Sequence, residues 1–389
     1  MKIFFTLTPA FNPYAGGVQR TTWKLGKYFS EQGLEVAYYS LDNEGHTIPD
    51  YGKLYYAPHS GGSKNSDNIQ DLQGRLEEVR PDVVINQMPY YKALRECLRD
   101  NKSKIGYLLL GCLRNSLFNF KSNARDRMRQ MLPKPALTVL DNMLGEQLIQ
   151  LRHWYRHRRD LIAIIDEHDY FILLAPPNRE ELAYFIGDYK SEKVLAIPNS
   201  IPQVVPELPQ KEKMILHVGR INIQQKRSDL LLEFWEKVYL KLPDWNFVIV
   251  GDGPYHERLQ ADLRQRDLPR VQLEGYQKPE PYYERAAIFM MPSAYEGFPN
   301  TLLEAQSFGC ASLIFNSYAA LSWIVEDGKD TRLIPAFDTA TMAQQTITLA
   351  QSDDVLQNMQ QAAVENARRF TIDRVGKIWL DFFAKCAKA

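Results

Sequence analysis

The sequence has little cysteine, no excess of either charge and no long hydrophobic run. Its cysteines are scattered, without a Cys-x-x-Cys pair or a cysteine–histidine cluster: Cys97, Cys112, Cys310 and Cys386. This scatter argues against a disulfide framework or a zinc site. Basic and acidic residues both number 47, whereas a dedicated nucleic-acid binder normally has a basic excess. No stretch approaches the length that spans a bilayer, and the apolar start, Lys2–Thr6, predicts a strand rather than a signal peptide.

What is present is a chain of 389 residues, long enough to favour two domains. Short β-branched and aromatic runs alternate with amphipathic segments, which predicts parallel sheets covered by helices. In the first half, for example, strands are expected at Glu35–Leu41 and Lys104–Leu110. The alternation stops in a proline-rich stretch and restarts at Met214–Val218. We therefore predict an N-terminal Rossmann-like domain over 1–200, a linker over 201–213 and a C-terminal Rossmann-like domain over 214–372.

Two cations follow the first strand of the second predicted domain. Gly219 and Arg220 end that strand, and Lys226 lies near the start of the next helix. Arginine offers a planar fork of donors and lysine a mobile charge, a combination that suits a diphosphate. The alternative is that both are ordinary surface charges.

A second motif, Tyr295-Glu296-Gly297-Phe298-Pro299-Asn300-Thr301, follows the predicted strand Ile288–Met291 and opens a helix at about Asn300. The free N–H groups of a helix start attract anions. Glu296 and Glu304 would read sugar hydroxyls, because carboxylates accept hydrogen bonds and repel phosphate. Alternatively they are a helix N-terminal glutamate and a solvated surface glutamate.

A third motif, Gly16-Gly17-Val18, lies between the first strand and the first helix. Two glycines allow the backbone to approach a ligand closely. A tight turn needs glycines as well, so this pair alone is weak evidence for a site.

In order and context, these features resemble glycosyltransferase family 4, the retaining glycosyl transferases group 1 with a GT-B fold. The resemblance extends from about Ile197 to Gly328 and is thinner in the N-terminal half, where Gly16-Gly17-Val18 is the main anchor. The matching motifs follow in the family's order: Gly219-Arg220, Lys226, Gly251-Asp252-Gly253-Pro254, Gly275-Tyr276, Pro292-Ser293, Glu296 and Glu304. The resemblance implies two Rossmann-like doubly wound domains facing each other across a cleft, with a C-terminal helix over 373–389 packing back on the first domain.

The resemblance also implies a role for each matched residue in a nucleotide-sugar site. Arg220, Lys226 and Glu296 would be catalytic: the two cations stabilise the leaving diphosphate, and Glu296 contacts the donor sugar. Glu304 would hold the ribose, Tyr276 beside Gly275 would line the base pocket, and Asn199 matches an asparagine at the hinge. Gly16 and Gly17 would close over the phosphates, and Gly219 would belong to the donor site. Backbone N–H groups would come from Gly297, Phe298, Pro299, Asn300 and Thr301.

One departure from the family pattern falls in the first domain. Members often have a histidine after the middle strand, at the sugar end of the cleft, where this chain has Gly111-Cys112-Leu113-Arg114. We expect His168 and His217 to be structural rather than substitutes. The missing histidine puts the donor hexose in question.

The implied function is transfer of a sugar from a nucleotide-diphosphate sugar, a UDP- or GDP-sugar, to a glycan or lipid-linked acceptor in bacterial polysaccharide or lipopolysaccharide synthesis. No Asp-x-Asp occurs, so we expect a metal-independent, front-face, retaining reaction with no cofactor. The alternatives are a non-catalytic sugar-nucleotide-binding partner subunit and a GT-B-shaped sugar-nucleotide epimerase.

A basic segment interrupts the first predicted domain. Its arginines are Arg152, Arg156, Arg158 and Arg159, with Trp154 and Tyr155 among them. This composition predicts a helix on an anionic membrane surface. The alternative is a solvated basic face whose aromatic residues pack inward. We expect a cytoplasmic protein, associated through this segment with the inner face of the cytoplasmic membrane.

Overall fold

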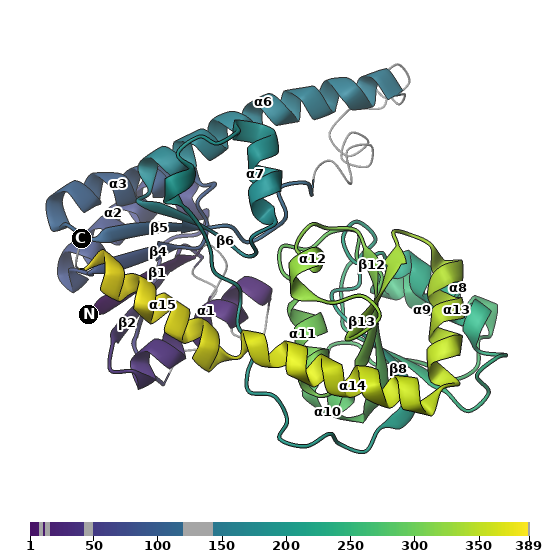
Figure 1. Ribbon diagram of the computed structural model, residues 1–389. Coiled ribbons are helices and arrows are strands. Elements are labelled where there is room, and N and C mark those ends of the chain that lie inside the picture. The colour runs from purple at the N-terminus through teal and green to yellow at the C-terminus, as the bar shows by residue number, and fades with distance from the viewer. Residues whose placement is uncertain (8–10, 12–15, 43–49, 120–142, 388–389) are drawn as a thin grey trace. The chain divides into compact units, whose positions relative to one another are not determined.

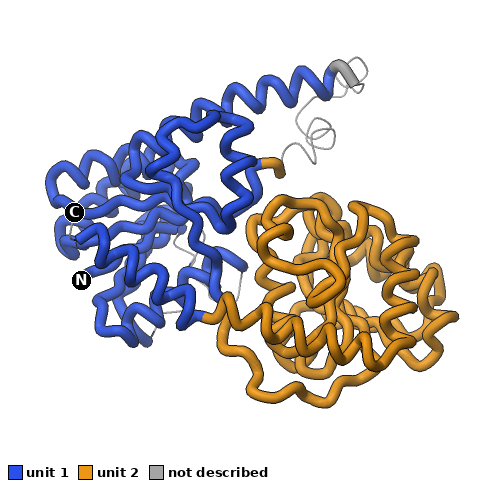
Figure 2. The backbone as a smooth tube through the Cα atoms, viewed as in Figure 1, with its two compact units in different colours: residues 1–117, 142–200, 372–389 blue, residues 118–141, 201–371 orange. Residues whose placement is uncertain are grey.

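The computed structural model describes residues 1–7, 11, 16–42, 50–119 and 143–387 (Figure 1). The chain divides into two compact units (Figure 2). Unit 1 comprises residues 1–117, 142–200 and 372–389, and unit 2 comprises residues 118–141 and 201–371.

Unit 1 is built on a seven-stranded parallel sheet in the order β3-β2-β1-β4-β5-β6-β7. Its strands are β1 (Lys2–Leu7), β2 (Glu35–Ser40), β3 (Lys53–Tyr56), β4 (Val83–Asn86), β5 (Leu108–Cys112), β6 (Tyr170–Leu173) and β7 (Val194–Ala196). The order reverses between β1 and β4, which pair with Ile3 opposite Val83. Such a reversal is the point at which doubly wound sheets bind ligands.

Helices cover both faces of this sheet. They are α1 (Gly17–Glu31), α2 (Ser66–Val79), α3 (Lys92–Ile105), α6 (Met143–Glu167), α7 (Asn178–Ile186) and α15 (Ile372–Cys386). One core joins the strands to α1 and α15 through residues such as Phe29 and Phe383, whose rings lie 5.5 Å apart. The other joins them to α2 and α3 through residues such as Leu72 and Leu98. The C-terminal helix α15 therefore packs in unit 1.

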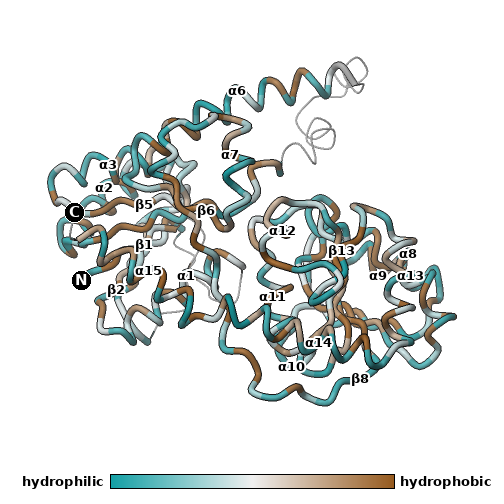
Figure 3. The backbone as a smooth tube through the Cα atoms, in the orientation of Figure 1, coloured by the Kyte–Doolittle hydropathy of each residue, from teal (hydrophilic) through white to brown (hydrophobic). Residues whose placement is uncertain are grey.

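Unit 2 is built on a six-stranded parallel sheet in the order β10-β9-β8-β11-β12-β13. Its strands are β8 (Glu212–Val218), β9 (Asn246–Val250), β10 (Val271–Leu273), β11 (Ala286–Met291), β12 (Ala311–Asn316) and β13 (Thr331–Pro335). The order reverses between β8 and β11, where Ile215 lies opposite Ile288. The strands are strongly apolar (Figure 3), as expected of parallel strands that are covered on both faces.

The helices of unit 2 follow its strands. They are α8 (Leu231–Val238), α9 (His256–Arg266), α10 (Glu280–Arg285), α11 (Asn300–Ser307), α12 (Leu321–Ile324), α13 (Thr339–Ala350) and α14 (Asp353–Ala367). One core joins the strands to α8, α9, α13 and α14. The proline-rich segment before β8 is held to this unit, because Ile201 and Val205 donate backbone hydrogen bonds to Phe370 and Ser307.

One predicted strand was misplaced. Lys104 and Ile105 form the last turn of α3, and β5 begins only at Leu108. Gly106 ends the helix with a φ of 91° and donates its N–H to the carbonyl of Lys102, a conformation that suits glycine after a helix. Lysines near a helix C-terminus interact favourably with its dipole, so Lys102 and Lys104 suit the helix better than a strand.

Within the described ranges, none of the helices combines the length and the apolar character that crossing a bilayer requires.

Candidate functional site

The candidate site of unit 2 lies where the sheet order reverses, at the carboxyl ends of β8 and β11. The predicted cations follow β8, and the predicted glutamate loop follows β11. Residues that are far apart in sequence therefore meet at the position where doubly wound sheets bind ligands.

Two glycines hold the backbone around Arg220. Gly219 donates its N–H to the carbonyl of Val250, and Ile221 donates to that of Asp252. Gly251, with a φ of 141°, packs so closely that a Cβ there would lie 1.9 Å from the Gly219 carbonyl oxygen. A Cβ on Gly253 would likewise lie 2.5 Å from the Ile221 oxygen. The Gly-x-Gly motif thus fixes the chain that presents Arg220, whose side chain is exposed.

Lys226 and Glu296 form a buried ion pair. The Lys226 Nζ lies 2.6 Å from Glu296 Oε1, and the side chains are only 12% and 7% exposed. Gln225 donates from Nε2 to the other carboxylate oxygen at 3.0 Å. The Asn222 Oδ1 accepts the backbone N–H groups of Gln225 and Lys226, so Asn222 sets the turn that aims both side chains at Glu296.

The loop after β11 is buried from Pro292 to Pro299. Asn300 donates its N–H to the carbonyl of Phe298, and Pro299 has no N–H to offer, so the prediction that every residue from Gly297 to Thr301 contributes a backbone donor was wrong. Within the part of the chain that is described, no acceptor binds the N–H groups of Gly297, Phe298 and Thr301. Three donors therefore remain at the start of α11 for a ligand.

The remaining predicted residues of unit 2 flank this centre. Glu304 is buried one turn into α11, and Tyr276 is 62% exposed. Tyr276 follows Gly275, whose carbonyl accepts the Gly251 N–H at 2.7 Å. Glu296 thus lies in the loop before α11 and Glu304 in α11 itself, whereas Tyr276 lies in the turn after β10.

Three further polar atoms near the ion pair were not predicted as site atoms. His217 Nε2, Ser293 Oγ and Tyr318 OH are buried, and no group in the described part of the chain forms a hydrogen bond with any of them. A buried polar atom without a partner costs about 1–3 kcal/mol, so such atoms usually await a ligand or water. His217 follows the alternation of β8, and its sequence environment could not separate a core histidine from a ligand-facing one.

Electrostatics keep two of these groups neutral. The pKa of His217 is lowered to about 4, chiefly by burial; a hydrogen bond to the Met290 carbonyl opposes this shift, and the Lys226 ammonium adds to it. That bond, 3.2 Å long at Nδ1, makes Nδ1 the donor and leaves Nε2 as an acceptor. Burial, and then the Glu296 carboxylate, raise the pKa of Tyr318 well above its ordinary value. The centre therefore combines one ion pair with neutral donors and acceptors.

The predicted residues of unit 1 lie at two places. Gly16 is the N-cap of α1, and its carbonyl accepts the N–H of Arg20, while Gly17 is the exposed first residue of the helix. Asn199 is buried after β7, and its Oδ1 accepts a hydrogen bond from Arg114 Nη1 at 3.0 Å. No group of three or more metal-binding side chains occurs within the ranges described above.

Comparisons with known proteins bear on both units. Residues 212–352 match the family model described as Glycosyl transferases group 1. The amylovoran biosynthesis glycosyltransferase AmsD of Erwinia amylovora is 26% identical over 94% of this chain and 95% of its own length. The TarM structure superposes with a TM-score of 0.76 over 98% of both chains, at 15% identity. The fold is GT-B.

Other relatives are longer than the matched region. An uncharacterized glycosyltransferase of Haemophilus influenzae is 31% identical, but the match covers 36% of this chain and 40% of that protein. An exopolysaccharide phosphotransferase of Streptomyces coelicolor is 27% identical over 56% of this chain. The matched region covers only 23% of the length of that relative. The comparisons confirm the predicted fold class and support a glycosyltransferase.

Proposed function

We propose that this protein is a retaining glycosyltransferase of family 4 that transfers a sugar from a UDP- or GDP-sugar to a glycan or lipid-linked acceptor. The observation that best supports the proposal is the buried pair of Lys226 and Glu296 at the reversal point of the second sheet. In the proposed site, the Lys226 ammonium contacts phosphate and the Glu296 carboxylate contacts sugar hydroxyls. The similarity to AmsD favours a role in bacterial polysaccharide or lipopolysaccharide synthesis.

In the proposed reaction, unit 2 binds the donor and unit 1 binds the acceptor. Negative charge grows on the diphosphate as the bond to the anomeric carbon breaks, and Arg220, Lys226 and the open N–H groups before α11 stabilise it. The acceptor oxygen attacks from the face that the diphosphate leaves. Because attack and departure share one face, the configuration at the anomeric carbon is retained, and the diphosphate takes the acceptor proton.

Donor binding and turnover test this proposal. Thermal unfolding is measured with UDP, GDP, ADP and their sugar derivatives, because a ligand that binds the folded state raises the unfolding temperature. The stabilising sugar nucleotide is then assayed for transfer, with and without excess EDTA. Stabilisation and EDTA-resistant transfer are expected. Binding without turnover would favour a non-catalytic subunit, epimerised donor would favour an epimerase, and loss of transfer in EDTA would contradict the metal-independent mechanism.

We also propose that the outer face of α6 contacts anionic lipid. Leu148, Leu151 and Tyr155 are 60%, 53% and 63% exposed, and Arg152, Arg156 and Arg159 are exposed beside them. Spacings of three and four residues place such side chains on one helix face. Apolar anchors flanked by arginines suit the headgroup region of an anionic bilayer.

Arg158 differs from the other predicted membrane arginines. Its guanidinium donates to the carbonyl of Phe185 and lies 5.6 Å from the Trp154 ring centroid, while the Trp154 Nε1 donates to the carbonyl of Tyr184. These two residues are held against α7, so we leave Arg158 out of the proposed lipid contact. It still lines, with Arg152, Arg156 and Arg159, a recess of about 570 Å³ along α6.

A further inference from the structure

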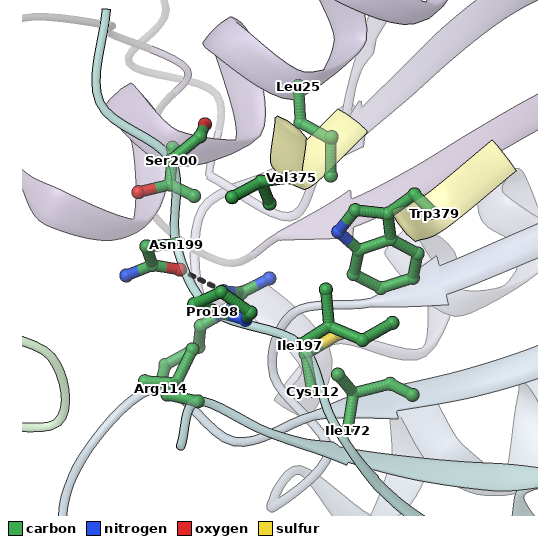
Figure 4. A pocket seen from close by; sticks show the side chains of 12 residues that line it. Leu25, Cys112, Arg114, Ile172, Ile197, Pro198, Asn199, Ser200, Val375 and Trp379 are labelled. Carbon is green, nitrogen blue, oxygen red and sulfur yellow. Dashed lines mark hydrogen bonds between the residues drawn. The ribbon is translucent and has the colours of Figure 1, made fainter. Parts of the chain in front are cut away.

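Arg114, which follows β5 in unit 1, has only neutral partners. Its Nε donates to Gln87 Oε1. Its Nη1 donates to Asn199 Oδ1 at 3.0 Å (Figure 4). In the described ranges no carboxylate pairs with it, and the only ionisable group that acts on its guanidinium is the Cys112 thiol. Burial raises the pKa of that thiol, so Cys112 remains neutral. The positive charge of Arg114 is therefore unbalanced.

Arg114 shares a small cavity with apolar side chains. The small cavity beside Arg114 is lined by Leu25, Ile172, Val375 and Trp379 (Figure 4). This burial lowers the pKa of Arg114, although arginine stays charged in proteins. The cavity measures about 10 Å³, enough for about one water and too small for a phosphate. A ligand must therefore meet the partly exposed outer side of Arg114.

The surrounding groups also leave hydrogen-bond donors in excess. A guanidinium has five N–H donors. Among the described residues, the hydrogen bonds to Gln87 and Asn199 use two of the five donors of Arg114. Gln87 uses its amide oxygen for Arg114, and its buried Nε2 finds no partner among the residues that the structure describes. If the Gln87 amide were turned round, its NH2 group would face the Nε–H of Arg114, and two donors would oppose each other. This cluster thus lacks an acceptor with negative charge.

The cluster lies where unit 1 would bind a ligand. The N–H of Gln87 donates to the carbonyl of Thr6, which places Gln87 at the reversal point between β1 and β4. Arg114 follows the neighbouring strand β5. Ligands of doubly wound sheets bind at this edge.

We propose that Arg114, oriented by Gln87 and Asn199, binds an anionic oxygen group, a phosphate or a carboxylate, on the acceptor substrate. The proposal rests on the proposed function, in which unit 1 takes the acceptor. It makes Arg114 a specificity residue that favours acidic or phosphorylated acceptors over neutral ones. Charge-assisted bidentate hydrogen bonds from arginine suit both anions.

Titration with phenyl phosphate and with benzoate tests the proposal, each at low ionic strength and with the nucleoside diphosphate that stabilises the protein present at saturation. The nucleotide keeps the probes off the donor site. The variants are Arg114→Gln, Arg114→Lys and, as a control, Arg99→Gln, which removes an exposed arginine of the same unit. Thermal unfolding confirms that each variant is folded.

We expect wild type and Arg99→Gln to bind at least one probe equally well. Arg114→Gln should bind about 10- to 100-fold more weakly, and Arg114→Lys should fall between them, because lysine keeps the charge without the fork. Preference for phenyl phosphate would indicate a phosphorylated acceptor, and preference for benzoate an acidic sugar; both support the site.

Three outcomes would overturn the proposal: no binding of either probe to wild type, unchanged binding by folded Arg114→Gln, or a loss of nucleotide affinity in Arg114→Gln with probe binding intact. The last outcome would assign Arg114 to the donor. Failure of the proposed function would look different, since no nucleotide would then bind wild type, while the probes can still be titrated alone.

Discussion

At the scale of single residues, the chemistry of unit 2 depends on which cations are already paired. Arg220 is exposed, and no carboxylate binds it in the described chain, whereas Lys226 is paired with the buried Glu296. The two cations should therefore respond differently to substitution, although both are proposed to act on the same diphosphate.

Arg220→Ala should lower turnover by about 100- to 1000-fold, the loss expected when a preorganised stabiliser of growing charge is removed. Glu304→Gln should mainly raise the Michaelis constant for the donor, because the ribose does not change charge during transfer. Steady-state kinetics of both variants check this pair, with Arg258→Ala, an exposed arginine of the same unit, as the control. Near-normal turnover of Arg220→Ala at saturating donor would show that Arg220 does not stabilise the diphosphate.

Lys226→Met should destabilise the protein by about 3–5 kcal/mol, because it leaves the Glu296 carboxylate buried without its cation. The double variant Lys226→Met/Glu296→Gln should recover most of that loss. We expect no sugar transfer from Lys226→Met or from the double variant, so the comparison with Glu296→Gln alone concerns stability. Urea unfolding of the two single variants and the double variant measures the coupling free energy. If the losses were simply additive, the ion pair would have no energetic role.

At the scale of elements, backbone contacts between neighbouring strands hold the proposed donor site. The turn after β9 crosses the turn after β8 at a distance that excludes any side chain at Gly251. The positive φ of Gly251, 141°, adds backbone strain for any other residue.

Gly251→Ala should therefore lower the unfolding temperature and weaken nucleotide binding together, because the clash displaces the backbone that presents Arg220. Gly74→Ala is the matched control: Gly74 lies inside α2, with open space where a Cβ would be. It should be neutral or stabilise by about 0.5–1 kcal/mol, the preference of helix interiors for alanine. Thermal unfolding with and without nucleotide compares the two. Equal effects would contradict the assigned role of Gly251.

The helix α6 gives a second prediction at this scale. The protein should sediment with acidic liposomes at low salt and be released as salt screens the attraction. Arg152→Gln/Arg156→Gln should reduce binding, each arginine contributing about 1 kcal/mol near an anionic surface. Arg258→Gln/Arg264→Gln, on the exposed face of α9, should not. Equal sedimentation with acidic and neutral liposomes would favour a solvated basic face.

At the scale of the whole molecule, both units contain buried neutral histidines. His168 donates from Nδ1 to the Ile164 carbonyl and accepts at Nε2 from Asn86, so a second ring proton would face a donor. Burial lowers the pKa of His157, His168 and His217 to about 4 from an ordinary 6.5.

Stability should fall as the pH drops from about 6.5 towards 4. In this window the histidines bind protons in the unfolded chain but not in the folded one. The free energy of unfolding therefore falls by about 1.4 kcal/mol per pH unit for each histidine. Urea unfolding at pH 7, 6 and 5 measures the slope, and His168→Gln should make it shallower. A constant free energy of unfolding from pH 7 to 5 would show that these histidines protonate equally in both states.

The sequence by itself determined the elements and their order. Alternating apolar runs and glycine-rich turns are local signals, and they placed most strands, the motif glycines and the candidate cations. Where local signals compete, prediction was wrong: Lys104 and Ile105 continue a helix up to Gly106. The prediction of a backbone donor at every residue from Gly297 to Thr301 was also wrong at Pro299, because proline has no N–H.

Only the tertiary structure decided which side chains meet. Lys226 and Glu296 are 70 residues apart, and Arg114 reaches Gln87 and Asn199 across 27 and 85 residues. These contacts depend on strand order, because parallel strands bring their carboxyl ends together irrespective of sequence distance. Burial depends on the same packing. Only the folded chain therefore shows that, among the described residues, His217 Nε2, Ser293 Oγ and Tyr318 OH have no hydrogen-bond partner and Arg114 has no carboxylate partner.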